Sequence, residues 1–412
     1  NCAPRRPALS QWREVYPCVC CAAEAVFSCP NSFFDLNSLQ NYTNYLNYTK
    51  KIAHVQKLLY LCALLLVFIT VMELQKGHIA GADLARIVGA LGIVLFHFSC
   101  YCEPLKPFLY STSNMPYGPI WVALFFALSG ACIVRSNTDT PIGLFYRKRW
   151  MSVFPIFFIA YLLAFALKLV VWGYWWGSIS PWTFPLTLIG MDSYFYYLRP
   201  NFCCVGEWFI GALLICYLLY PLLRKALHHL PYTTTVILVA GSCFIHFISW
   251  FTIEPWHNVW VCVTIFYLGM LLAQFPAVFT SKISFALSAI LTLILFVVPL
   301  PFKQVGALSQ IIYPILTGLA CLVLLVHTGV YLERQERLKQ GMTYLGKLSY
   351  PIFLIQQTTI QAGFSKWSAL SLSEACTLLG MDILLTFLFA YIIITIHTEL
   401  THRHEKSIRH NA

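Results

Sequence analysis

Ten segments of this sequence are long and apolar enough to cross a lipid bilayer, and no other property constrains the fold as much. A spanning α-helix needs about 20 mainly apolar residues. The segments lie near residues 80–101, 116–136, 150–172, 205–223, 232–252, 257–275, 283–301, 306–328, 348–364 and 375–397. They lack the alternating polarity of a membrane β-barrel strand. We therefore predict an all-α, polytopic bundle of about ten transmembrane helices.

The composition narrows the class of protein further. Of the 412 residues, 59% are hydrophobic and only 10% are charged, whereas a soluble domain carries roughly 25% charged residues. This excludes a water-soluble globular protein and a disordered chain. It also excludes a nucleic-acid binder, whose basic surface has to face water. The partner that the composition predicts is the lipid bilayer itself.

Lysine and arginine residues are unevenly divided between the two sides of the predicted bundle. If the first of the ten helices begins in the cytoplasm, fourteen of these residues fall on the cytoplasmic side. They are Arg135, Arg147, Lys148, Arg149, Arg224, Lys225, Lys282, Arg334, Arg337, Lys339, Lys347, Arg403, Lys406 and Arg409. The opposite side holds four, namely Lys106, Arg199, Lys303 and Lys366. Because basic loops stay in the cytoplasm, we predict a cytoplasmic C-terminus.

Residues 1–71 differ in character and are predicted to form a separate N-terminal extension. They contain a cysteine cluster at residues 18–21, whose spacing fits no standard zinc finger, so we predict no metal site. The apolar run Leu58–Met72 is shorter than a typical span. It is a candidate for a further hydrophobic helix, a signal anchor, an interfacial helix or part of a leader. An alternative is that the functional chain begins at Met72, and we predict a membrane domain over residues 72–412.

Ionisable residues inside the first predicted helix are the strongest functional signal. A charge at the bilayer centre costs at least about 2.5–3.5 kcal/mol, so such groups face a bundle interior or a wet cavity. Arg86 and His97 are eleven positions apart, which places them on one helix face about 16 Å apart along the axis. An arginine fork suits a phosphate group, and a histidine can act as a general base near neutral pH. The structural alternatives are an arginine that anchors to headgroups and a hydrogen-bonded packing histidine.

Four motifs in order resemble those of one known family. The first is the Arg-x10-His spacing from Arg86 to His97. The others are residues 125–130 (Phe-Phe-Ala-Leu-Ser-Gly), the basic segment 145–149 followed by Pro155, and residues 348–354 (Leu-Ser-Tyr-Pro-Ile-Phe-Leu). Weaker agreement comes from residues 207–209 and 267–270. Together they resemble the acyltransferase-3 family of integral membrane O-acyltransferases over about residues 80–400.

This resemblance implies an activity and a donor. The family moves acetyl or other short acyl groups onto hydroxyls of surface or secreted glycans, so O-acetylation of a cell-envelope polysaccharide is implied. The implied donor substrate is cytoplasmic acyl-CoA, with no bound cofactor and no metal, and the implied acceptor is a glycan or glycolipid. The family's commonest setting favours a bacterial inner membrane over a eukaryotic endomembrane, which stays open as the alternative. By the same resemblance His97 and Arg86 are catalytic, and Arg147, Lys148 and Arg149 bind the donor.

Two positions depart from the family pattern. Ser152 stands where a second loop arginine is expected, three positions before the proline. Gln356 stands where the late segment often ends in histidine, and glutamine keeps hydrogen bonding but cannot titrate. We predict that Glu207, Trp208, Tyr350 and Gln356 contact substrate. For Glu207 an equal alternative is a solvated carboxylate at a helix end.

A non-enzymatic transporter or flippase of glycolipids or small solutes is the alternative function. Ten helices with a few buried charges suit that class as well, although we find no internal repeat of the kind many transporters show. Cys100 and Cys102 fall on the same predicted side as Cys203 and Cys204. A disulfide between the two pairs is therefore a candidate, and its connectivity stays open.

Overall fold

The computed structural model describes most of the chain between Ile79 and His410. The described residues are 79–137, 140–173, 180–196, 205, 208–248, 255–298, 307–365 and 370–410. The chain divides into two units, Asn1–Val71 and Met72–Ala412, and the description below concerns the second. The predictions for residues 1–71, the cysteine cluster and the Leu58–Met72 run among them, lie outside the described residues.

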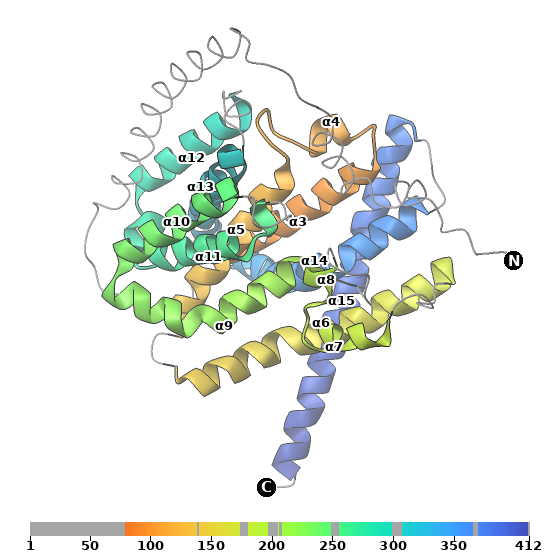
Figure 1. The fold of residues 1–412 in the computed structure, drawn as a ribbon. Coiled ribbons are helices and arrows are strands. Elements are labelled where there is room, and N and C mark those ends of the chain that lie inside the picture. The colour runs from red at the N-terminus through yellow and green to blue at the C-terminus, as the bar shows by residue number, and fades with distance from the viewer. Residues whose placement is uncertain are drawn as a thin grey trace, which may run out of the picture. The chain divides into compact units, whose positions relative to one another are not determined.

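The described part of the second unit is built from helices and contains no β-strand, which confirms the all-α class (Figure 1). Each of the ten predicted segments coincides with one helix. These are α3 (Ala82–Tyr101), α5 (Tyr117–Ser136), α6 (Ile142–Trp172), α9 (Trp208–His229), α10 (Pro231–Ile248), α11 (Val259–Leu272), α12 (Lys282–Val297), α13 (Ala307–Leu332), α14 (Glu336–Phe364) and α15 (Leu372–His410). Short α-helices lie between them: α4 (Lys106–Leu109), α7 (Phe184–Leu188) and α8 (Asp192–Phe195).

Six of the described helices, α3, α5, α6, α9, α13 and α15, are long and apolar enough to cross a membrane by length and composition. The apolar parts of α10, α11 and α12 are shorter. Helix α14 belongs to neither group, since its second half carries Gln356, Thr358 and Thr359, all of them buried inside the bundle. These features agree with a multi-pass membrane protein, while the count of about ten spans stays a prediction.

The basic segment predicted as a loop is helical in the structure. Helix α6 begins at Ile142, directly after Pro141, and continues through the basic residues without a break. Between Leu144 and Phe154 the sequence has neither glycine nor proline to end the helix. Because successive helical residues are 100° apart, the three side chains of residues 147–149 leave α6 in different directions and do not form one patch.

Helix α3 packs against α5, α13 and α14, and α14 in turn packs against α15 and α6. A Cβ atom at Gly346 of α14 would lie 2.8 Å from Oδ1 of Asp83 near the start of α3. Ten residues later, Gln356 contacts His97 near the end of α3. The two helices therefore run in the same direction, as the first and ninth spans of an alternating bundle should.

Helices α5 and α11 cross so closely that their backbones touch at two glycines. A Cβ atom at Gly130 would overlap the carbonyl oxygen of Phe266, and one at Gly269 would overlap that of Ala127. Close approach of helix backbones at small residues is a common way to pack membrane helices. Both glycines belong to segments that carry the family resemblance, so part of that resemblance reflects packing and not chemistry.

We predict that Gly269→Val lowers the thermal unfolding midpoint of the purified protein, because the added side chain forces α11 away from α5. Overpacking of this kind costs about 1–3 kcal/mol. The matched control is Gly380→Ala in α15, where an added Cβ meets nothing within 4 Å. Equal midpoints for the two variants would contradict the close crossing.

Candidate functional site

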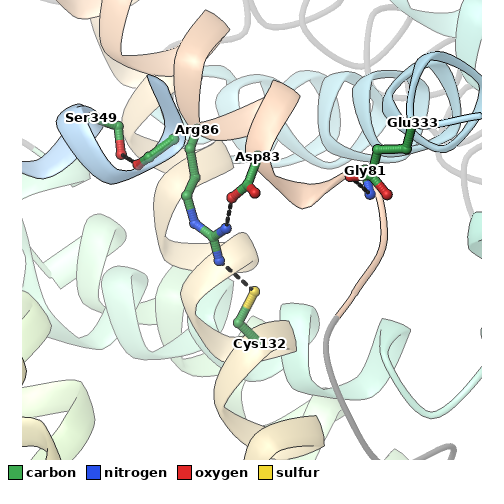
Figure 2. A network of polar contacts seen from close by, with 7 residues as sticks. Gly81, Asp83, Arg86, Cys132, Glu333 and Ser349 are labelled. Atoms are coloured by element: carbon green, nitrogen blue, oxygen red, sulfur yellow. Dashed lines mark hydrogen bonds and ion pairs between the residues drawn. The ribbon is translucent and has the colours of Figure 1, made fainter. Parts of the chain in front are cut away.

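The guanidinium of Arg86 is held by two neighbours near the start of α3. Its Nη1 forms an ion pair with Oδ1 of Asp83, one turn earlier, and its Nη2 donates to Sγ of Cys132 on α5 at 3.3 Å (Figure 2). The side chains of Arg86 and Asp83 are 28% and 10% exposed. The arginine charge is thus compensated inside the bundle, and a thiol is a weak acceptor for its second nitrogen.

The start of α3 is anchored to the end of α13. Gly81 has a left-handed backbone (φ 77°), and its N–H donates to Oε1 of Glu333 at 2.7 Å, as Figure 2 shows. A Cβ atom at Gly81 would overlap the carbonyl oxygen of Val326, so only glycine fits this approach and conformation. This contact fixes the end of α3 from which Arg86 projects.

His97 contacts Gln356, a pair of predicted site residues that lie 259 positions apart in the sequence. Nε2 of the Gln356 amide lies 2.8 Å from Nδ1 of His97, and Gln356 is fully buried. In this orientation Oε1 of Gln356 has no hydrogen-bond partner. Exchanging the amide oxygen and nitrogen of Gln356 leaves the atom positions unchanged. In that orientation Oε1 accepts a hydrogen bond from Nδ1–H of His97. That arrangement leaves Nε2 of the imidazole as a base.

Arg86 and His97 contact different helices of the bundle. The first faces α5 and Asp83, whereas the second faces α14. Eleven residues of helix separate them by about 16 Å along the axis. Between them Ala90 and Ile93 are buried in the bundle. The two residues mark the two ends of one helix face, and a single substrate has to be extended to reach both.

The three basic residues predicted to bind the donor occupy different surroundings. Arg147 and Lys148 are exposed, whereas Arg149 is half-buried. The charge of Arg149 acts on the side chains of Tyr217 and Tyr220 in α9. Its Nε is buried and has no hydrogen-bond partner. Arg149 is therefore the residue of this segment that presents an unused donor to the interior of the bundle.

Ser152, where the sequence departs from the family pattern, hydrogen-bonds within its own helix in the structure. Its side chain is exposed, and its hydroxyl donates to the carbonyl oxygen of Arg149, one turn earlier in α6, at 3.0 Å. No second arginine takes its place there, and the neighbouring Arg147 and Lys148 remain exposed. Arg149 thus lacks the arginine neighbour that the family pattern expects at position 152.

Tyr350 and Trp208, both predicted to bind substrate, contact Val153 and His257 respectively. The Tyr350 hydroxyl donates to the carbonyl oxygen of Val153 at 3.3 Å and so joins α14 to α6. Trp208 is the first residue of α9. The centroid of its ring lies 4.3 Å from that of the His257 ring. Glu207 lies outside the described residues. So do Cys203 and Cys204, and the disulfide stays a prediction.

The structure adds three side chains that the sequence patterns did not single out. Cys132 contacts Arg86, as described above. The ring of His257, just before α11, packs against that of Trp208. Asp382 of α15 is 4% exposed, and both its carboxylate oxygens lack a hydrogen-bond partner. It is the one acidic residue of the predicted span 375–397, which is the signal that could have identified it.

Comparison with known proteins assigns a family to most of the second unit. The sequence matches the acyltransferase-3 family, described as "Acyltransferase domain", over residues 79–398. No curated protein and no solved structure matches the chain. The matched range includes every described helix that contributes to the site.

We predict that Asp83→Asn destabilises the protein by about 1–3 kcal/mol, because a charged partner of Arg86 is replaced by a neutral one in a partly buried place. The measurement is the thermal unfolding midpoint in detergent. Glu103→Gln is the matched control, since Glu103 also pairs with a basic residue three positions away but is 79% exposed, and such surface pairs contribute little. If the control loses as much stability as Asp83→Asn, the pair has no special structural role.

Proposed function

The chain belongs to the acyltransferase-3 family of membrane acyltransferases, and we propose that it moves an acetyl or other short acyl group from cytoplasmic acyl-CoA to a hydroxyl of a surface or secreted glycan. Family membership identifies the protein as an enzyme, so the transporter alternative is set aside. The observation that carries the proposed chemistry is the contact that holds the imidazole of His97 against the buried amide of Gln356. We further propose a bacterial inner membrane as its location, with the C-terminus in the cytoplasm.

In the proposed reaction His97 is the general base. Nε2 of His97 takes the proton of the acceptor hydroxyl while that oxygen attacks the carbonyl carbon of the acyl thioester. The new ester bond forms as the carbon–sulfur bond breaks, and the imidazolium returns its proton to the departing CoA thiolate. Gln356 contributes by accepting a hydrogen bond from Nδ1–H, which fixes the ring orientation and the tautomer in which Nε2 carries no proton.

The basic residues at the other end of the site are proposed to bind the donor. Arg149 has a buried Nε without a partner, and an oxygen of a CoA phosphate would supply the missing acceptor. Arg86 keeps only a thiol as the acceptor for its Nη2, so it can turn that nitrogen toward a phosphate oxygen. Arginine is well suited to this role because its planar fork matches phosphate geometry. Arg147 and Lys148, both exposed, would add charge at the surface.

We predict that Gln356→Leu lowers kcat for acyl transfer by about tenfold or more, since a general base contributes about 10²–10⁴-fold and depends on its orientation. The assay follows transfer from radiolabelled acetyl-CoA by the purified full chain. Gln357→Leu removes the neighbouring amide and serves as the control, with kcat expected within about twofold of the unmodified protein. Equal losses in both variants would argue against a specific role for Gln356.

We predict that Arg149→Gln raises KM for acetyl-CoA by about tenfold, the loss expected for one charge-assisted hydrogen bond. The matched control is Lys339→Gln, which removes a positive charge from the exposed start of α14. An unchanged KM in Arg149→Gln, in a protein that still transfers acetyl groups, would place the donor elsewhere.

A further inference from the structure

A layer of polar side chains crosses the contact between α14 and α15, next to the His97–Gln356 pair. The hydroxyls of Thr359 and Thr386 lie 2.7 Å apart, and the Thr359 hydroxyl donates to the backbone oxygen of Gln356 at 2.8 Å. Asp382 lies one turn from Thr386 on the same face of α15. The layer therefore begins at Gln356, the partner of the proposed general base, and ends at a buried carboxylate.

Asp382 has acceptors that the protein does not use. Both oxygens are buried without a hydrogen-bond partner. Thr359 is the nearby side chain that can donate a hydrogen bond to this carboxylate, yet in the structure its hydroxyl donates to the Gln356 backbone oxygen. A buried carboxylate without donors is costly in a membrane protein and typically marks a functional position. The missing partner has to be a group that brings hydrogen-bond donors.

A cavity of about 530 Å³ lies at the end of the same pair of helices, bounded also by the end of α6. Met381, the neighbour of Asp382, lines it, as does Gly363, which is seven residues or two turns beyond Gln356 on α14. Most of its wall surface is apolar, and its polar lining residues are Ser365, Ser373, Glu374 and Thr377. Met381 is 62% exposed, so the cavity is open to the surroundings of the bundle, where lipid chains lie.

We propose that Asp382 binds the acceptor, and that the acceptor is an amphiphile with neighbouring hydroxyls and an apolar tail, such as a glycolipid. The two carboxylate oxygens would each accept a hydrogen bond from one of two adjacent hydroxyls. The apolar cavity would hold the tail, and the hydroxyl to be acylated would face His97. This inference rests on the proposed function, because it assigns the acceptor of that reaction.

Photoaffinity labelling tests the site without relying on catalysis. The probe is an alkyl glucoside with a diazirine in its alkyl chain, added to the full-length protein in lipid nanodiscs. A diazirine-bearing alkyl alcohol of the same length, which has a single hydroxyl, serves as the comparison probe. We expect saturable labelling of peptides from residues 362–381 by the glucoside, with a half-saturating concentration at least about tenfold lower than for the alcohol.

Variants of Asp382 connect this labelling to the carboxylate. Asp382→Leu should raise the half-saturating concentration of the glucoside by about tenfold or more, and Asp382→Asn should raise it less, because the amide keeps one acceptor. Glu399→Gln removes an exposed carboxylate from the same helix and should change nothing. The thermal midpoint of both Asp382 variants should be unchanged or higher, since the carboxylate has no partner to lose.

Two results would overturn the proposal. One is equal glucoside labelling in the unmodified protein and in a folded Asp382→Asn or Asp382→Leu variant. The other is equal half-saturation by the glucoside and the alcohol. A third result separates the two proposals. If labelling depends on Asp382 but the protein transfers no acetyl group from acetyl-CoA, the binding site is supported and the proposed function is rejected.

Discussion

The hydrogen bond between His97 and Gln356 joins α3 to α14 in a part of the bundle where a polar group has few other hydrogen-bond partners. Side chains in the interior of a membrane protein have no bulk water to pair with, so each polar group has to find a protein partner or a ligand. On α3 this requirement is met twice, by Gln356 at His97 and by Asp83 at Arg86. Helix α14 contributes to both places, because Gly346 packs on Asp83. The position of α14 therefore decides how both functional side chains of α3 are held.

The same requirement separates side chains that are satisfied from those that await a ligand. The Ser349 hydroxyl donates to the backbone of its own helix, and the Tyr350 hydroxyl donates to α6, so neither has an unused donor. Nε of Arg149 and the carboxylate of Asp382 are buried and unpartnered. The first is a donor and suits a phosphate of the acyl donor, whereas the second is an acceptor and suits hydroxyls of the acyl acceptor. The two substrates would then approach His97 from different parts of the bundle.

The sequence predicts much of the fold because the length of an apolar helix is a local property. Each predicted segment matches a helix of the structure, and the Asp83–Arg86 contact follows from their spacing of one turn. The contact of His97 with Gln356 joins residues 259 positions apart, and no local pattern encodes it. The likeness of segment 145–149 to the family's basic loop predicts a loop there, yet nothing in the segment ends a helix and α6 includes it. Asp382 was missed although an acidic residue in an apolar span is itself a signal.

The most direct test of this account is the rate of acetyl transfer by the double variant His97→Ala/Gln356→Leu, compared with each single variant. If Gln356 acts by orienting His97, removing it from a protein that already lacks the imidazole should cost nothing, and the double variant should transfer acetyl groups as slowly as His97→Ala alone. If the two losses instead multiply, the residues act independently, and the pairing of imidazole and amide at the centre of this account would be wrong.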